Sequence, residues 1–253
     1  MRGFWALRSL LFVIWMAATV APWGSLMVVL SLFMRGERLY WATMVWLRLA
    51  IWGARVICGV RHRVHGLHHL PTVAQRRQAV VLAAKHQSAW EAFAFPTLMP
   101  HPLAYVFKRE LLWVPFFGWA MGRLDMIHID RRKRNQAWAR VATQGRQLAA
   151  QGVWVIMFPE GTRMARGCRG TYKNGAARLA IDCGLPIVPI AATSGRCWPA
   201  RSLLLRPGLV DISIGPPIDS SGRQSDELMR EVETWIEAEM RRLDPEAYPG
   251  QAG

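Results

Sequence analysis

The sequence contains 26 consecutive positions without a charged side chain, at residues 9–34. A straight helix of that length would reach about 39 Å at ~1.5 Å per residue, and about 20 apolar residues cross the hydrocarbon core of a bilayer. Ala21-Pro22-Trp23-Gly24 lies in the middle of this stretch, and proline with glycine predicts a break. The stretch is therefore either one spanning anchor or a hairpin that dips into one leaflet. Its length disfavours a cleaved signal peptide.

A second apolar stretch follows at residues 40–60. Arg48 and Arg55 are seven residues apart in it and so share one helical face. Its tryptophans are side chains of the kind that anchor at the level of lipid headgroups. This pattern predicts a helix in the membrane interface with its arginines toward lipid phosphates. Residues 1–60 are thus expected to form a membrane-anchoring helical segment.

The net charge of +15 predicts an anionic partner, either a membrane surface or a nucleic acid. The basic residues are not arranged with exposed aromatic residues as in a nucleic-acid-binding module, so a membrane is the expected partner and a nucleic acid is not. The four cysteines contain no C-x-x-C pair, which indicates free thiols in a reducing compartment.

The chain beyond residue 60 has the pattern of an α/β domain. Short apolar runs, which read as strands, lie at residues 79–84, 103–107, 126–129, 153–158, 186–192 and 209–214. Helical patterns lie between or after them, at residues 135–150, 175–183 and 225–243. This alternation predicts a mostly parallel sheet flanked by helices over residues 61–243, with a loosely ordered tail at 244–253.

The segment from His86 to Glu91 follows the first of these strands. A histidine at the carboxyl end of a strand is suited to general-base chemistry, and a carboxylate can hold its ring in one tautomer. Residues five apart do not share a helical face, so His86 must precede the helix if it touches Glu91. Ser88-x-x-Glu91 also matches a capping box, in which Glu91 bonds only backbone N–H groups. Both interpretations remain open on this segment.

The second polar segment follows the apolar run at 153–158 and contains Gly161, Thr162 and Arg163. The glycine permits a tight turn, and a hydroxyl beside a guanidinium is a good pairing for phosphate. Lys173 lies eleven residues beyond Thr162. A solvated turn closed by a surface ion pair is the alternative interpretation.

Four blocks together resemble the glycerolipid acyltransferase family, and within it the bacterial 1-acyl-sn-glycerol-3-phosphate acyltransferases. They are His86-Gln87-Ser88-Ala89-Trp90-Glu91; Lys108-Arg109-Glu110-Leu111-x-x-Val114-Pro115-x-x-Gly118, running on to Ile129-Asp130-Arg131; Phe158-Pro159-Glu160-Gly161-Thr162-Arg163, followed by Tyr172-Lys173-Asn174-Gly175; and Ile187-Val188-Pro189-Ile190. They occur in the family's order and cover residues 78–195. An apolar segment ahead of the first block is also similar to the family. One block would be weak, whereas four in order are specific.

The resemblance implies transfer of a fatty acyl group from acyl-CoA or acyl carrier protein to the sn-2 hydroxyl of lysophosphatidate, giving phosphatidate. His86 would be the general base and Glu91 would orient it. The acceptor carries a phosphate, and the residues that would bind it are Arg109, Arg131 and Arg163, with Lys108 and Lys173 behind them and Thr162 beside them. Glu160 and Gly161 would shape the acceptor loop. No cofactor, metal or acyl-enzyme is implied. The expected location is the bacterial inner membrane, with the catalytic domain facing the cytoplasm.

The sequence departs from the family pattern at two places. Glu91 stands where the commonest pattern has aspartate, so the carboxylate is one methylene farther from the backbone. An aromatic residue usual near residues 126–128 is missing, which bears on acceptor fit. A homologue without activity is therefore one alternative. Others are an acyltransferase for glycerol 3-phosphate or a lyso-ornithine lipid, or a basic membrane- or nucleic-acid-binding protein without enzymatic activity.

Two further groups of side chains have open interpretations. Trp113, Phe116, Phe117 and Trp119 are expected either to line an acyl tunnel or membrane-facing lip, or to belong to the ordinary core. The histidines at 62, 65, 68 and 69 are close in sequence but have no acidic or cysteine partner in the pattern, and are expected to be surface residues between elements.

Overall fold

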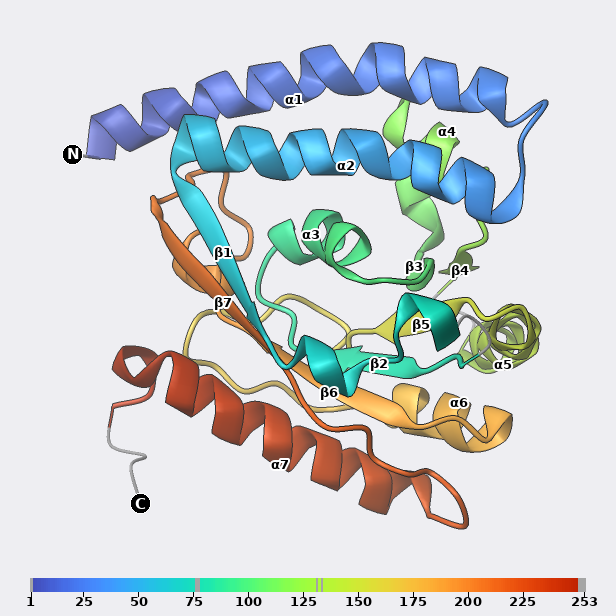
Figure 1. Ribbon diagram of the computed structural model, residues 1–253. Coiled ribbons are helices and arrows are strands. Elements are labelled where there is room, and N and C mark those ends of the chain that lie inside the picture. Colours follow the sequence, from blue (N-terminus) through green and yellow to red (C-terminus); the bar gives the residue numbers. More distant parts are fainter. Residues whose placement is uncertain (1, 76–77, 131, 133, 250–253) are drawn as a thin grey trace.

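The computed structural model of the chain describes residues 2–75, 78–130, 132 and 134–249. Figure 1 shows a central sheet, with the two N-terminal helices above it and the C-terminal helix below it. The helices are α1 (Arg2–Leu30), α2 (Gly36–Cys58), α3 (Trp90–Leu98), α4 (Phe117–Met121), α5 (Arg134–Ala150), α6 (Gly175–Cys183) and α7 (Ser225–Leu243). Short 3₁₀ turns connect several elements: η1 (Leu67–His69), η2 (Val73–Gln75), η3 (Arg109–Trp113), η4 (Ser194–Arg196) and η5 (Pro245–Ala247).

Within the described residues the sheet has seven strands in the order β1-β7-β6-β2-β5-β3-β4. They are β1 (Val60–His65), β2 (Val81–Ala84), β3 (Leu103–Lys108), β4 (Ile127–Ile129), β5 (Trp154–Met157), β6 (Ile187–Ala192) and β7 (Gly208–Ile214). All neighbouring pairs are parallel except β6 and β7. The predicted α/β fold with a mostly parallel sheet flanked by helices is therefore confirmed.

The central strands are buried on both faces, which is why they appear in the sequence as continuous apolar runs. Alternate residues of β2 show this: Leu82 packs with the helices above the sheet, whereas Val81 and Ala83 pack with α6 and α7 below it. Two apolar cores therefore sandwich the sheet. In β2 the register is fixed on both sides, with Val81 opposite Val155 in β5 and Ile187 in β6.

The edge strand β1 was missed in the sequence because only Val60 and Val64 of its six residues are apolar, so it forms no apolar run. It pairs in parallel with β7, and Arg63 and His65 both contact Asp211 of that strand, at 2.8 and 3.4 Å. His62 and His65 therefore lie within a strand rather than between elements. In the part of the chain that the structure describes, no group of three or more His, Cys, Asp or Glu side chains could hold a metal ion.

Helix α1 is continuous through Pro22, so the predicted break at Ala21-Pro22-Trp23-Gly24 does not occur. Proline removes a single backbone donor, and packing against neighbouring elements can hold the helix around it. Two contacts fix α1 against α2: the Trp46 indole donates to the Thr19 hydroxyl at 3.1 Å, and the Trp15 ring fills the space beside Gly53. The two helices form an antiparallel pair over the sheet (Figure 1).

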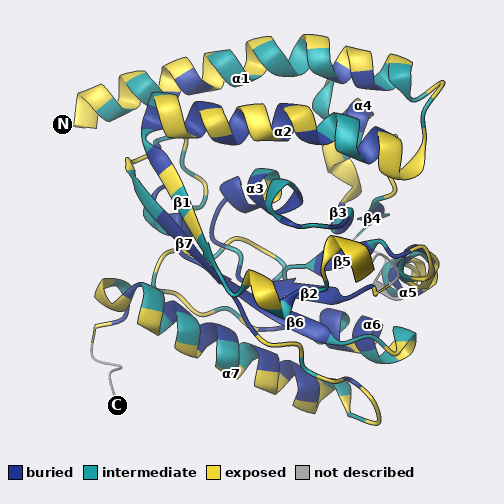
Figure 2. Cartoon of the chain, in the orientation of Figure 1, coloured by how far each residue is buried: buried dark blue, intermediate teal, exposed yellow. Residues whose placement is uncertain are grey.

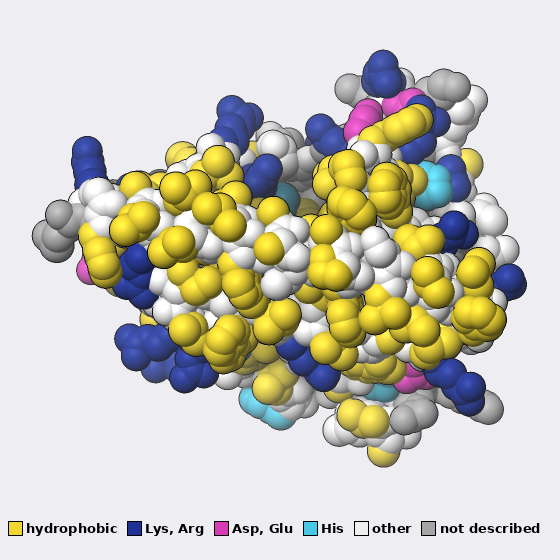
Figure 3. Space-filling model, turned by 90° about the horizontal axis from the view of Figure 1, so that it is seen from above, with side chains coloured by type: hydrophobic (Ala, Val, Ile, Leu, Met, Phe, Trp, Pro, Cys, Tyr) yellow, Lys and Arg dark blue, Asp and Glu magenta, His cyan; other side chains and the backbone are white. Residues whose placement is uncertain are grey.

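The helix pair has one buried side and one apolar exposed side. Both helices are long and apolar enough to cross a membrane by length and composition alone, and α2 is the more buried of the two. Figure 2 shows this difference, with exposed positions all along α1 and a buried side on α2. Arg48 and Arg55 are both exposed. Seen from above, apolar side chains cover much of this face, and Lys and Arg side chains gather at its rim (Figure 3).

The C-terminal tail is ordered farther than the sequence suggested. Asp244 is fully buried and accepts two hydrogen bonds from Arg166 at 2.7 Å each, and Arg196 lies 3.4 Å away. The chain then continues through η5, and Tyr248 is also buried. Ion pairing and burial therefore hold the first part of the tail against the domain.

Candidate active site

The predicted site residues lie where the strands end. His86 follows β2, residues 158–163 follow β5, and Lys108 and Arg109 end β3 and begin η3. The strands β2, β5, β3 and β4 are neighbours in that order and run parallel, so their carboxyl ends form one edge of the sheet. That edge is where α/β folds place their sites. The topology therefore gathers three of the four sequence blocks at one place.

His86 and Glu91 are in direct contact. The His86 Nδ1 atom lies 2.5 Å from Glu91 Oε2, and the Glu91 side chain is fully buried while that of His86 is 18% exposed. His86 lies outside α3, in the turn before it, as contact with Glu91 required. The His86 ring also stacks on Phe158, with ring centroids 3.9 Å apart. The ring is therefore held by a carboxylate at one nitrogen and by an aromatic face.

The Glu91 carboxylate also makes the backbone bonds of the capping interpretation. Its Oε1 atom accepts from the N–H groups of Gln87 at 2.8 Å and Ser88 at 3.1 Å, and the Ser88 hydroxyl accepts from the Trp90 N–H at 3.0 Å. Glu91 thus uses one oxygen for the helix start and the other for His86. α3 begins after Ala89, which makes no side-chain cap bond, so the predicted capping box with Ser88 as the N-cap does not form, although Glu91 does bond backbone N–H groups.

Ser194 is a site residue that the sequence reasoning missed. Its hydroxyl donates a hydrogen bond to Glu91 Oε1, although the two residues are 103 positions apart. Ser194 begins η4 directly after β6, and β6 is the other neighbour of β2 in the sheet. The polar residues that follow the predicted strand at 186–192 were the available signal, because they end at the same sheet edge as His86.

The Glu160 side chain turns into the interior of the domain. Its side chain is fully buried, its Oε1 atom accepts from the Lys85 ammonium at 2.7 Å, and its Oε2 atom accepts from the backbone N–H of His86 at 2.9 Å. Burial raises the pKa of the Glu160 carboxyl, and the Lys85 charge opposes that shift. Glu160 therefore supports the site from below, and Lys85, which the sequence reasoning did not assign, is its partner.

The loop after β5 carries the predicted acceptor residues. Gly161 has φ +69°, and a Cβ at this position would lie 2.9 Å from the Lys173 Nζ atom, so the Lys173 ammonium lies over the glycine. The Lys173 N–H donates to the Pro159 carbonyl at 3.0 Å, which closes the loop. Thr162, Arg163 and Lys173 are exposed. The structure therefore brings Gly161 and Lys173 together and leaves the hydroxyl and the cations facing outward.

The cations after β3 are also exposed. Lys108 ends the strand, and Arg109 lies 4.0 Å from the Asp130 carboxylate that follows β4. The Arg132 N–H and the guanidinium groups of Arg132 and Arg109 lower the pKa of Asp130. Arg131, the remaining predicted cation, lies outside the described residues.

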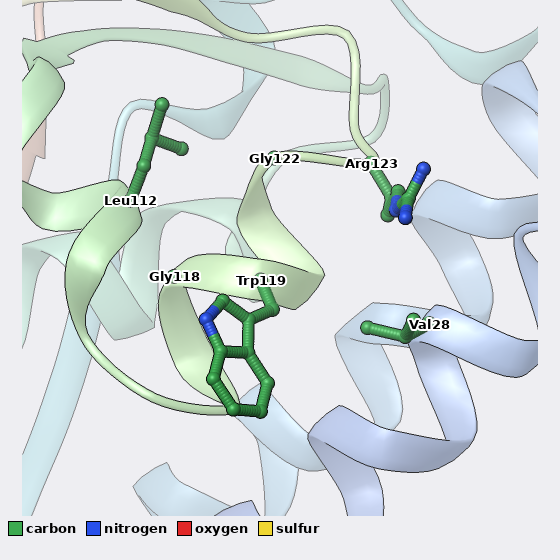
Figure 4. Close-up of a pocket in the computed structure, with 6 residues that line it drawn as sticks. All are labelled: Val28, Leu112, Gly118, Trp119, Gly122 and Arg123. Carbon is green, nitrogen blue, oxygen red and sulfur yellow. The ribbon is translucent and has the colours of Figure 1, made fainter.

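The aromatic residues near α4 are divided between surface and interior. Trp113 and Trp119 are exposed, whereas Phe117 packs against Trp46 of α2, with ring centroids 6.2 Å apart. A shallow pocket of about 380 Å³ lies between Trp119 and Val28 of α1 (Figure 4). Its lining is mostly apolar, with Arg123 at one side, and includes none of the predicted site residues.

Comparison with known proteins gives a consistent result. The model of the Acyltransferase family matches residues 61–193. A curated 1-acyl-sn-glycerol-3-phosphate acyltransferase from Pseudomonas aeruginosa is 37% identical over 95% of this chain and 93% of its own length. One from Escherichia coli is 34% identical over 72% of this chain and 75% of its own length. The crystal structure of the 1-acyl-sn-glycerophosphate acyltransferase PlsC from Thermotoga maritima has the same fold, with a TM-score of 0.79, 23% identity, and coverage of 96% of this chain and 98% of that one.

Proposed function

Because the chain belongs to the Acyltransferase family, we propose that it is an enzyme that moves a fatty acyl group from a thioester to the sn-2 hydroxyl of lysophosphatidate, giving phosphatidate. The observation that carries this proposal is the pairing of His86 Nδ1 with the buried Glu91 carboxylate at 2.5 Å, at the sheet edge that also bears the exposed cations. The names of the P. aeruginosa and E. coli relatives support the same reaction.

His86 supplies the base. A carboxylate at Nδ1 favours the tautomer with hydrogen on that nitrogen, which leaves the Nε2 lone pair to accept a proton. Nε2 takes the proton of the acceptor hydroxyl as its oxygen attacks the thioester carbonyl. The carbon–sulfur bond then breaks, and the imidazolium returns the proton to the departing thiolate. Glu91 stabilises the imidazolium between these two transfers.

The exposed cations bind the acceptor phosphate. Lys108 and Arg109 approach from the end of β3, and Arg163 and Lys173 from the loop after β5. Guanidinium groups bind phosphate oxygens in pairs, and an ammonium adds a point charge. Arg131 is proposed as a fifth cation from its place in the sequence. Thr162 adds a hydroxyl donor, while Gly161 and Glu160 shape the loop from within.

The proposed setting is a phospholipid membrane. The exposed apolar side of α1 and α2, with Lys and Arg at its rim, supports docking on an anionic bilayer, where the lysolipid acceptor resides. We assign the chain to the bacterial inner membrane with the catalytic domain facing the cytoplasm, where acyl-CoA and acyl carrier protein are the candidate donors. Sedimentation with inner-membrane vesicles, and protease access to the catalytic domain from the cytoplasmic side alone, test this assignment.

The reaction is tested with detergent-purified protein, lysophosphatidate and a radiolabelled acyl thioester, either acyl-CoA or acyl carrier protein. The wild type should form phosphatidate, His86→Ala should not, and His68→Ala, which changes an exposed histidine in η1, should match the wild type. Product from His86→Ala at the wild-type rate would contradict the role of the base. If product forms only when glycerol 3-phosphate or a lyso-ornithine lipid replaces lysophosphatidate, then that compound, and not lysophosphatidate, is the acceptor.

A further inference from the structure

A buried cluster of four side chains lies directly beneath His86: Lys85, Glu160, Tyr172 and Glu237. Lys85 is fully buried, and its ammonium donates to Glu160 Oε1 at 2.7 Å, to Glu237 Oε1 at 2.6 Å and to the Cys168 carbonyl at 3.1 Å. An ammonium has three donors, so the three bonds use all of them. The Tyr172 hydroxyl donates to the same Glu237 oxygen at 2.8 Å.

The cluster forms a chain of contacts from α7 to the catalytic base. Glu237 lies in α7 and holds Lys85, Lys85 holds Glu160, and Glu160 accepts from the His86 N–H at 2.9 Å. The Glu237 and Lys85 positions are 152 residues apart in the sequence. The last long helix of the chain is thereby connected to the backbone of His86 through two ionic contacts.

The cluster holds two carboxyl groups against a single ammonium. Burial raises the pKa of the Tyr172 hydroxyl, so this group remains a hydrogen-bond donor. Glu237 Oε2 is buried and has no hydrogen-bond partner among the residues described. Buried ionic groups generally contribute no more stability than well-packed apolar side chains of the same volume, and an unpartnered polar atom is a cost. Stability alone therefore does not account for a glutamate at this position of α7.

We propose that Glu237 is a positioning residue, which acts through Lys85 and Glu160 to hold the His86 backbone and the loop that carries Thr162 and Arg163. This inference rests on the proposed function, since it concerns the same base and acceptor loop. It adds a residue from beyond 193, the last position of the family match. Because Glu160 serves both His86 and the acceptor loop, loss of Glu237 should affect the chemical step and acceptor binding together, but not donor binding.

The test compares three glutamate variants in α7. Glu237→Leu removes both oxygens and leaves Lys85 in a one-to-one pair with Glu160. Glu237→Gln retains an oxygen that can accept from Lys85 and Tyr172. Glu231→Leu is the matched control, because Glu231 is an exposed residue of the same helix that pairs with Arg223 at the surface. Each protein is assayed for kcat and for the KM of acceptor and donor separately, and hydrogen exchange is measured on the peptide that contains His86.

We expect Glu237→Leu to lower kcat by about tenfold or more and to raise the acceptor KM about fivefold, with the donor KM within about twofold, since small displacements of a reacting group are costly. Exchange of the His86 peptide should become at least about tenfold faster in the same variant. Glu237→Gln should stay within about threefold of the wild type, because it keeps the acceptor oxygen. Glu231→Leu should match the wild type in every measurement.

If Glu237→Leu lowers only the apparent kcat, and both KM values and the exchange rate of the His86 peptide stay at wild-type values, less of the protein is folded and the role of Glu237 is purely structural. That result would overturn the proposal. If Glu237→Leu does not fold, the Tyr172→Phe variant tests the proposal instead. It removes only the hydroxyl that donates to Glu237, and we expect kcat to fall and the acceptor KM to rise, each by about threefold, with the donor KM unchanged. Wild-type values of both kcat and the acceptor KM would overturn the proposal. Hydrogen exchange does not depend on activity, so a wild type that makes no phosphatidate would contradict the proposed function while the positioning of His86 is still measured.

Discussion

Gly24 of α1 lies directly against the backbone of Phe116: a Cβ on Gly24 would lie 2.7 Å from the Phe116 carbonyl oxygen. Phe116 has φ 61° and ψ −59°, and the Phe117 N–H donates back to the Pro115 carbonyl at 2.6 Å. This geometry is a γ-turn of the strained type. The turn lies between Arg109 and α4, so α1 abuts the segment that carries part of the proposed acceptor site.

Gly24→Ala is expected to lower the free energy of unfolding by about 1–3 kcal/mol, because overpacking against backbone forces the neighbouring element to shift. Thermal unfolding measures the change. Gly3→Ala is the control, since a Cβ there would meet nothing within 4 Å. Alanine also favours a helix over glycine, so the control should hold or raise the midpoint. A Gly24→Ala protein as stable as the wild type would contradict the close approach of α1 to the turn.

Glu91→Asp is expected to lower kcat about tenfold, although aspartate is the commoner residue in the family, because small misplacements of catalytic groups are costly. The Glu91 carboxylate contacts His86, two backbone N–H groups and the Ser194 hydroxyl at once. A carboxylate one methylene shorter cannot keep all four contacts on this backbone. Initial rates with lysophosphatidate measure the effect, with the exposed Glu231→Asp as control. A rise in activity would mean that the longer side chain impairs the enzyme.

Gly161→Ala and Gly222→Ala separate a backbone effect from a site effect. Both glycines have positive φ, at +69° and +67°, so alanine should cost each about 1–2 kcal/mol of stability. Only at Gly161 would the new Cβ meet another group, the Lys173 ammonium at 2.9 Å. We therefore expect the acceptor KM to rise in Gly161→Ala alone. Equal KM values in the two variants would remove the Gly161–Lys173 contact from the acceptor site.

Alkylation should distinguish the cysteines of the folded domain. Burial raises the pKa of the Cys197 thiol from 9.0 to about 11, against the nearby Arg196 and Arg166 charges. The thiolate is the reactive form, so iodoacetamide at about pH 8 should label the exposed Cys168 and spare Cys197. Above pH 9 the folded state holds the Cys197 proton more tightly than the unfolded chain, so stability should fall as the pH rises toward 11. Early labelling of Cys197 would contradict its burial.

The fold was predictable where local pattern and tertiary environment agree. The central strands are buried on both faces, so each is a short apolar run, and all six predicted strands are present. β1 was missed because an edge strand carries charged residues that break the run. The break predicted at Pro22 was wrong because neighbouring elements hold α1 around a single missing donor. Local sequence does not contain those neighbours.

The candidate site was likewise predictable only where its contacts are local in the sequence. The His86–Glu91 contact spans five residues, so spacing alone restricted its geometry. The Ser194 hydroxyl and the Glu237 carboxylate reach the site from 103 and 152 residues away from their partners. Their positions depend on the order of strands in the sheet and on the path of α7. No motif in one sequence specifies that order, although polar residues at strand ends indicate which edge to inspect.

The first strand in the sequence, β1, can pair in the sheet only after the last strand, β7, has been synthesised. β1 lies at the edge of the sheet beside β7, and residues 66–207 must be synthesised between the two strands. At about 5–20 residues per second, translation needs roughly 7 to 28 seconds to cover that interval. During this time α1 and α2 are complete, but the sheet that covers the inner side of α2 is not. The inner side of α2 therefore stays uncovered by the sheet throughout this interval, and lipid or a chaperone has to shield it until the domain is complete.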